Sequence, residues 1–162
     1  MRCTLLLVLT CAFAAIATAG AQTIFLVRHA ERADAGGVAQ TDPGLSKEGH
    51  ERAAALARTL QDAKIVAIYA TEYSRTQETA QPLAEKIGVR ATIIPAKGII
   101  ALIAKLKNLT GNVLIVGHSN TLPEIVKALG VSSPITIGEL EYDNLLVVVG
   151  DPLPRILQLH YR

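Results

Sequence analysis

The sequence predicts an α/β domain arranged as a three-layer sandwich, with a mainly parallel sheet, helices on both faces and an antiparallel C-terminal edge. Short apolar runs rich in Val, Ile and Leu alternate along the chain with longer stretches whose apolar residues recur at helical spacing. This alternation is typical of βαβ units and a parallel sheet. The last two apolar runs are separated by a turn containing Gly150-Asp151-Pro152, which indicates a hairpin.

The first strand and helix are predicted at residues 23–28 and 46–62. The segment between them is polar and rich in Gly, Asp and Pro, so we expect a surface loop. In the helix, one apolar face follows the i, i+3, i+4, i+7 spacing of a buried surface. Its residues are Ala53, Leu56, Ala57 and Leu60.

A second strand is expected at residues 65–70 and a second helix at residues 73–87. Pro82 lies inside that helix and is expected to kink or split it, because proline has no backbone N–H to donate. Gly88 is a natural end point. The remaining elements are predicted at residues 91–94 (strand), 99–109 (helix), 113–116 (strand) and 122–129 (helix), then at 145–149 and 155–160 (hairpin strands).

The first 21 residues have the composition of a secretory signal peptide. Arg2 supplies a positive start, residues 5–17 an apolar stretch, and Ala19-Gly20-Ala21 a small-residue cleavage pattern. We therefore expect a secreted or periplasmic domain at residues 22–162. A retained membrane anchor is less favoured, because the apolar run is shorter than the ~20 residues of a spanning helix.

The composition limits the classes of partner. Both cysteines, Cys3 and Cys11, precede residue 22, so the expected domain has no thiol for a disulfide or a nucleophile. The net charge is +2 and the basic residues are scattered, so no nucleic-acid partner is expected. No later apolar stretch is long enough for membrane insertion, and the oligomeric state stays open.

Cationic and imidazole side chains stand at the ends of three predicted strands. Arg28 and His29 end the first, Arg75 follows the second, and His118 follows the fourth. In open parallel sheets, ligands bind outside the carboxyl ends of the strands. Arginine offers a permanently charged fork that matches phosphate oxygens, and a neutral imidazole can attack phosphorus. The pattern predicts a site for a phosphoryl group, with the two arginines as clamps and a second, protonated imidazole stabilising charge.

These segments resemble the motifs of the histidine phosphatase superfamily, also called phosphoglycerate mutase-like. Residues 26–31 resemble its signature, residues 71–80 its second arginine motif and residues 116–121 its second histidine motif. The resemblance implies that His29 is the phosphorylated nucleophile, that Arg28 and Arg75 hold the phosphoryl oxygens, and that His118 completes the pocket. It implies neither a metal nor another cofactor.

The sequence does not assign the group that protonates the leaving group. The mutase-like branch usually carries an acidic residue after the second arginine, but residues 88–98 hold Arg90 and Lys97 and no Asp or Glu. The acid-phosphatase branch has an aspartate directly after the second histidine, where this chain has Ser119. The remaining candidates are Glu31, Asp34 and Glu124.

Some of these residues also have plainer explanations. Ser119 and Asn120 either bind substrate or cap the following helix. Arg75 in isolation resembles a surface arginine paired with Glu72 or Glu78 at helical spacing. Tyr73 is expected to pack rather than to line the pocket.

The combined features favour an exported phosphatase that hydrolyses phosphomonoesters, with phosphoramidates as a further substrate class, through a phosphohistidine intermediate. The expected partner is a small phosphorylated substrate. Mutases of the family are longer and cover the pocket, whereas this chain is short, which favours hydrolysis. The alternatives are a module that binds phosphorylated ligands with little turnover, or a phosphotransferase or mutase.

Overall fold

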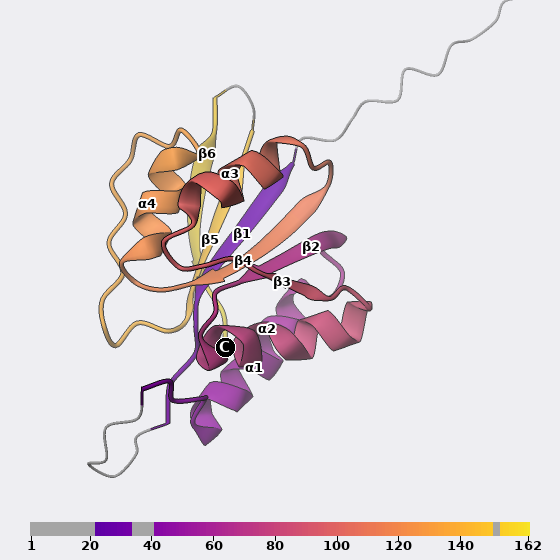
Figure 1. The fold of residues 1–162 in the computed structure, drawn as a ribbon, viewed down its shortest axis with the longest axis vertical. Helices are drawn as coiled ribbons and strands as arrows, with labels where there is room; N and C mark the ends of the chain where they lie inside the picture. The colour runs from indigo at the N-terminus through magenta and orange to yellow at the C-terminus, as the bar shows by residue number, and fades with distance from the viewer. Residues whose placement is uncertain (1–21, 34–40, 151–152) are drawn as a thin grey trace, which may run out of the picture.

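The computed structural model describes residues 22–33, 41–150 and 153–162, and these residues form one mixed six-stranded sheet and four helices (Figure 1). The strands are β1 (Thr23–Arg28), β2 (Ile65–Ala70), β3 (Ala91–Ile93), β4 (Asn112–Gly117), β5 (Asn144–Val149) and β6 (Arg155–His160). The helices are α1 (Lys47–Leu60), α2 (Ser74–Ile87), α3 (Ile99–Lys107) and α4 (Thr121–Ala128).

The sheet has the strand order β3-β2-β4-β1-β5-β6. The first four strands in this order are mutually parallel, and β5 pairs antiparallel with β1 and with β6. The predicted fold class, including the antiparallel C-terminal edge, is therefore confirmed. Because β1, β2 and β4 are adjacent and parallel, their carboxyl ends lie at one edge of the sheet.

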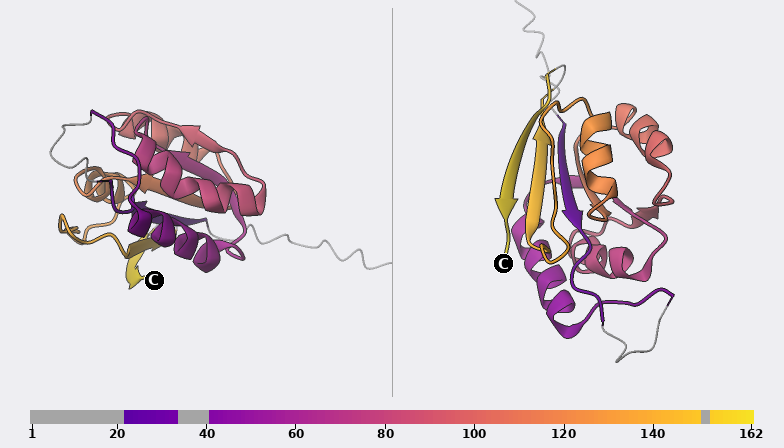
Figure 2. Two further views of the ribbon diagram at one scale, coloured as in Figure 1. Left: turned by 90° about the horizontal axis from the view of Figure 1, so that it is seen from below. Right: turned by 90° about the vertical axis from the view of Figure 1, so that its left-hand side faces the viewer.

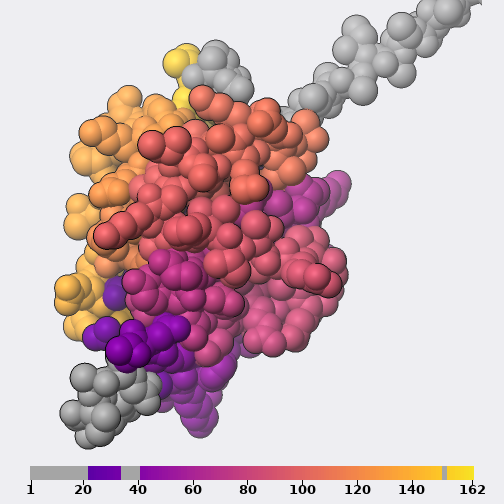
Figure 3. Space-filling view, viewed as in Figure 1, coloured from indigo at the N-terminus to yellow at the C-terminus, as the bar shows by residue number. Residues whose placement is uncertain are grey.

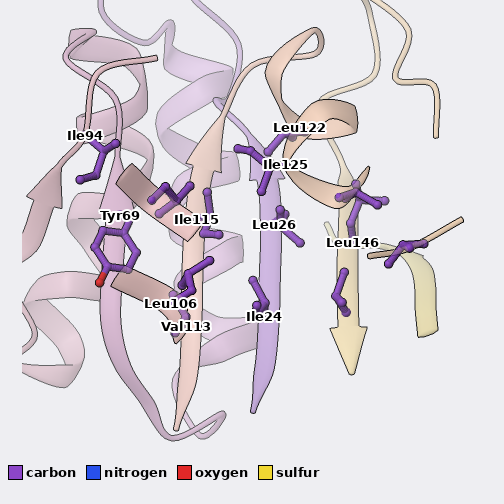
Figure 4. Packing of buried hydrophobic residues seen from close by; sticks show 14 of the residues in the cluster. Ile24, Leu26, Tyr69, Ile94, Leu106, Val113, Ile115, Leu122, Ile125 and Leu146 are labelled. Atoms are coloured by element: carbon purple, nitrogen blue, oxygen red, sulfur yellow. The ribbon is translucent and has the colours of Figure 1, made fainter. Parts of the chain in front are cut away.

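Two helical layers cover the two faces of the sheet (Figures 1 and 2). Ile24 and Leu26 of β1 face one side, together with residues of α3 and α4, whereas Val27 faces the side on which α1 and α2 pack. This alternation is the period of two that a strand buried on both faces requires. Figure 4 shows the first of these faces, with Ile115 and Leu146 beside the β1 side chains. The space-filling view shows the outer face of the molecule on the side where α3 lies (Figure 3).

Local signals in the sequence set the ends of two helices. The side chain of Ser46 caps α1 by accepting a hydrogen bond from the N–H of Gly49 at 3.1 Å. Gly49 also allows a close approach, since a Cβ there would collide with the carbonyl oxygen of Glu31. The helix α2 ends at Gly88, whose φ of 70° is left-handed and whose N–H donates to the Ala84 carbonyl.

The observed elements differ from the predicted ones mainly at their ends. The helix α2 runs through Pro82 as one helix, so the proline does not split it. Its buried residues Thr79, Ala80 and Leu83 lie on both sides of the proline, and their packing stabilises the helix despite the lost hydrogen bond. The helix α3 ends two residues earlier than predicted, at Lys107.

None of the helices in the described part of the chain is both long and apolar enough to cross a membrane.

Candidate active site

The carboxyl ends of β1, β2 and β4 bring His29, Thr71 and His118 together. The register places Arg28 beside Gly117, and the N–H of His29 donates to the Gly117 carbonyl oxygen at 2.9 Å. The centroids of the two histidine rings lie 5.3 Å apart with the rings inclined by 63°. Residues nearly 90 positions apart in sequence therefore share one site, because their strands are neighbours in the sheet.

The ring of His29 is neutral and its tautomer is fixed. Its Nδ1 lies 2.8 Å from the carbonyl oxygen of Ala30, and because a carbonyl only accepts, Nδ1 carries the proton. The lone pair is then on Nε2. Burial lowers the pKa of His29 to about 4, and the charges of Arg75, His118 and Arg28 act in the same direction. At neutral pH this imidazole has a free lone pair at a defined atom.

The pKa of His118 is lowered as well. Its Nε2 lies 3.0 Å from the hydroxyl of Thr71, which itself contacts the hydroxyl of Thr76 at 2.9 Å. Burial and the positive charge of Arg75 lower the pKa of His118 to about 4. The sequence predicts one neutral and one protonated ring, whereas both pKa values are lowered to the same extent, because both rings are buried beside the same arginines. A bound dianion supplies the negative charge that favours protonation of His118.

Arg28 is held by the loop before β5, close enough to the two histidines for its charge to act on both. Its Nη1 donates to the carbonyl oxygens of Gly138 and Glu139 at 2.9 and 2.6 Å, and the ring of Tyr142 lies 4.2 Å from its Cζ. The side chain is buried, and its Nε–H has no hydrogen-bond partner among the residues that the structure describes. The guanidinium is thus fixed by the loop before β5, and Arg28 does not itself line the pocket that opens at this edge of the sheet.

Arg75 enters the site from the first turn of α2. Its Cζ lies 4.4 Å over the ring of Tyr73, and its Nη1 lies 3.5 Å from the Asp42 carboxylate. The ion pair is thus with Asp42, not with Glu72 or Glu78. Since Arg75 also lowers the pKa of both histidines, its charge acts directly on the site.

A pocket of about 330 Å³ opens at this edge of the sheet. It is lined by His29, Tyr73, Arg75, Ala96, Lys97, His118, Ser119, Asn120 and Thr121. This lining contains no Asp or Glu. The described structure therefore presents an electropositive pocket at the point where the sequence predicts a phosphoryl site.

Ser119 and Asn120 lie where the chain turns from β4 into α4. The side chain of Asn120, at the N-cap position, makes no capping hydrogen bond. Instead, the hydroxyl of Thr121 accepts from the N–H of His118 at 3.1 Å and closes the turn. The first turn of α4 faces the pocket, which places the positive end of a helix dipole near a bound anion.

Two of the three general-acid candidates, Glu31 and Glu124, are not among the residues that line the pocket. The carboxylate of Glu31 accepts three hydrogen bonds from Arg52 of α1, at 2.6 to 2.9 Å. This ion pair engages both carboxylate oxygens and holds the side chain against Arg52 of α1, away from the pocket lining. Glu124 lies exposed on α4, and Asp34 lies outside the described residues.

Sequence reasoning missed several residues of the site. It expected Tyr73 to pack, but the ring lines the pocket, contacts His118 edge-on at 5.2 Å between centroids and supports Arg75. Thr71 was named only as part of a motif. Its position directly after β2, parallel to β4, was the available signal for its contact with His118.

Tyr142 and Asp42 come from loops that no pattern connects to the site. Tyr142 lies in the loop before β5, directly after a turn in which the N–H of Glu141 donates to the Gly138 carbonyl oxygen at 3.1 Å. Asp42 accepts hydrogen bonds from the N–H and the hydroxyl of Ser74, which lowers its pKa. Its carboxylate thereby joins the loop before α1 to the start of α2.

Within the described residues, no group of three or more His, Cys, Asp or Glu side chains is arranged to hold a metal ion.

The fold and the paired histidines at the strand ends define a class of α/β proteins. The model of the histidine phosphatase superfamily (branch 1) matches residues 24–99, which contain β1, the Arg75 motif and the start of α3. Over these residues the chain is similar to this superfamily. The comparison with curated protein sequences gives no match.

Solved structures share the fold at low sequence identity. The α-ribazole phosphatase of Shigella flexneri superposes with a TM-score of 0.70 at 16% identity, covering 85% of this chain and 96% of that one. The protein histidine phosphatase SixA, complexed with tungstate, gives 0.68 at 19% identity and covers 85% and 96%. A mycobacterial glucosyl-3-phosphoglycerate phosphatase gives 0.62 at 16% identity and covers 87% and 98%.

Proposed function

We propose that this protein is a phosphatase that hydrolyses phosphomonoesters through a phosphohistidine intermediate on His29. The observation that carries the proposal is the state of that ring. The hydrogen bond from Nδ1 to Ala30 leaves the lone pair on Nε2, and the lowered pKa keeps it unprotonated at neutral pH. An unprotonated, oriented imidazole beside two guanidinium groups is suited to attack on phosphorus.

The first step transfers the phosphoryl group to the protein. The lone pair of His29 Nε2 forms a bond to phosphorus while the bond from phosphorus to the leaving oxygen breaks, and that oxygen takes up a proton from a solvent water molecule. Arg75, which lines the pocket, and the nearby positive charge of Arg28 stabilise the charge on the transferred oxygens. His118, protonated in the presence of the dianion, contributes a further positive charge.

The second step releases orthophosphate. The oxygen of a water molecule bonds to phosphorus, the bond from phosphorus to Nε2 breaks, and the water proton goes to the phosphate or the solvent. The ring of His29 returns to its neutral form, held by Ala30. The pocket at the strand ends opens to solvent between the β3–α3 turn and the start of α4, which gives water access.

The pocket lining favours leaving groups that do not need a carboxylic acid. It contains no Asp or Glu, and general acid catalysis typically contributes ~10²–10⁴-fold. Aryl phosphates and phosphoramidates are therefore the expected substrates, and alkyl phosphates the slow ones. The same feature motivates the alternative of a phosphate-binding module with little turnover, and a phosphotransferase is the third possibility.

The test combines activity with detection of the intermediate. Purified protein is mixed with a ³²P-labelled aryl phosphate and quenched in alkaline denaturant, and the label on the protein is tested for acid lability. We expect a base-stable, acid-labile phosphoprotein that is absent in His29→Ala and present in His50→Ala, a matched change at an exposed histidine. Turnover by His29→Ala at a wild-type rate would overturn the mechanism.

The same assay separates the alternatives. A binding module would bind phosphate without forming labelled protein in a single turnover. A phosphotransferase would transfer the label to an added alcohol in preference to water.

Export is part of the proposal and rests on residues 1–21 alone. Expression of the full chain in a bacterium, followed by mass measurement of the periplasmic fraction, tests it. A product beginning near residue 22 is expected, and retention of the full-length chain in the cytoplasm would contradict export.

A further inference from the structure

We propose that Lys97 selects substrates whose leaving group carries a negative charge close to the scissile oxygen. This inference rests on the proposed phosphatase function and concerns the side of the pocket that receives the leaving group. The phosphoryl group itself is accounted for by the two arginines, the two histidines and the start of α4. Lys97 is the cation of the pocket lining that this arrangement leaves without a role.

Lys97 lies in a tight turn with a well-defined backbone. The N–H of Gly98 donates to the carbonyl oxygen of Pro95 at 2.6 Å, which closes the turn. A Cβ at Gly98 would lie 2.9 Å from that same carbonyl oxygen, so glycine permits the close approach. The ammonium group is therefore carried by a turn of fixed geometry and not by a long loop.

The turn is also attached to the phosphoryl site. The N–H of Ala96 donates to the Glu72 carboxylate at 2.7 Å, and Glu72 lies three residues before Arg75. The N–H of Ile94, a buried core residue, donates to the Ala70 carbonyl at the end of β2. These bonds couple the position of Lys97 to the strand end and to the arginine motif.

The charge of Lys97 is available for a ligand. No carboxylate in the described ranges lies within 4.0 Å of its ammonium nitrogen, in contrast to the ion pairs Arg52–Glu31 and Arg75–Asp42. The pocket lining contains no acidic side chain that would repel an anion. An ammonium group at the rim of such a pocket favours a carboxylate or second phosphate on the departing group over a neutral one.

The expected size of the effect follows from the exposure of Lys97. Exposed ion pairs contribute modestly, so a preference of about threefold to fivefold for an anionic leaving group is expected from this residue. Increased ionic strength should reduce it, because exposed charges are screened.

The test uses two aryl phosphates of the same shape, 4-carboxyphenyl phosphate and 4-carbamoylphenyl phosphate, which differ by one negative charge. The measured quantity is the ratio of their kcat/KM values in wild-type protein, Lys97→Met and Lys97→Glu. We expect the carboxylate-to-amide ratio to fall about threefold to fivefold in Lys97→Met and further in Lys97→Glu. Lys105→Met, which removes an exposed lysine of α3 outside the pocket lining, should leave the ratio unchanged.

The outcomes separate this inference from the proposed function. If wild-type protein hydrolyses neither compound, the phosphatase proposal fails. If it hydrolyses both and the Lys97 variants lose activity on both to the same extent, or lose none, the charge preference is refuted while the phosphatase function stands.

Discussion

Acidification from pH 7 to pH 5 should destabilise this protein mainly through the two histidines of its pocket. Both rings have pKa values lowered to about 4, with burial as the largest cause, against 6.5 for an unperturbed histidine. Between pH 4 and pH 6.5 the two histidines are protonated in the unfolded chain but remain neutral in the folded one. Stability is therefore retained above about pH 6.5 and lost as the pH falls toward 4.

The magnitude follows from the two pKa values. At pH 5 an unfolded histidine is almost fully protonated and a folded one with a pKa of about 4 is mostly neutral, which costs about 2 kcal/mol per ring. The two rings together should lower the free energy of unfolding by about 4 kcal/mol, a large part of the stability of a small domain. The carboxylates with lowered pKa values, such as Asp42, act below this window.

The assay is urea unfolding at pH 7 and pH 5 in phosphate-free buffer, since bound phosphate would stabilise the folded state. The wild type is compared with the double variant His29→Asn, His118→Gln, whose amides can replace the hydrogen bonds to Ala30 and Thr71. The double variant should lose about 4 kcal/mol less than the wild type over this range. His50→Gln, at an exposed histidine, should behave like the wild type. Equal losses in wild type and double variant would refute the argument that the buried rings are neutral.

Three further predictions concern ligand binding and individual contacts. Binding of tungstate, a dianion at pH 7, should be accompanied by proton uptake, because the bound negative charge raises the pKa of His118. Calorimetric titrations in two buffers of different ionisation enthalpy should therefore give different heats of binding. Identical heats would contradict this prediction. Thr71→Val should lower the free energy of unfolding by about 1–3 kcal/mol in urea titrations, since it leaves Nε2 of His118 without its hydrogen-bond partner. Thr71→Ser should retain most of the wild-type stability. A valine variant as stable as the wild type would exclude this contact. Tyr142→Ala should lower kcat/KM on an aryl phosphate about threefold to tenfold by removing the ring over Arg28. Tyr142→Phe, which keeps the ring, should have a kcat/KM near that of the wild type. A loss in Tyr142→Phe as large as in Tyr142→Ala would show that the hydroxyl, not the ring, supports activity.

The sequence determined the order of elements and the strand ends from which the site is built. The apolar run before Arg28 and the run before His118 could form buried strands only in a two-sided sheet, and parallel strands present their carboxyl ends at one edge. The strand order was not predicted, and it is the tertiary structure that places β4 beside β1 and so brings His29 and His118 into one site. The start of α1 at Ser46 and the end of α2 at Gly88 could also be predicted from the sequence, because a side-chain cap and a left-handed backbone conformation each depend on one or two residues.

Only the tertiary structure decided which groups surround the pocket and in which charge state they stand. The ion pair between Arg52 of α1 and Glu31 holds this general-acid candidate away from the pocket lining. The ring of Tyr142, 114 positions further along the chain than Arg28, packs over its guanidinium. The pKa values of His29 and His118 depend on burial, which no local pattern contains. Periodicity and motifs report on near neighbours in sequence, whereas burial and charge at a site depend on every segment that packs around it.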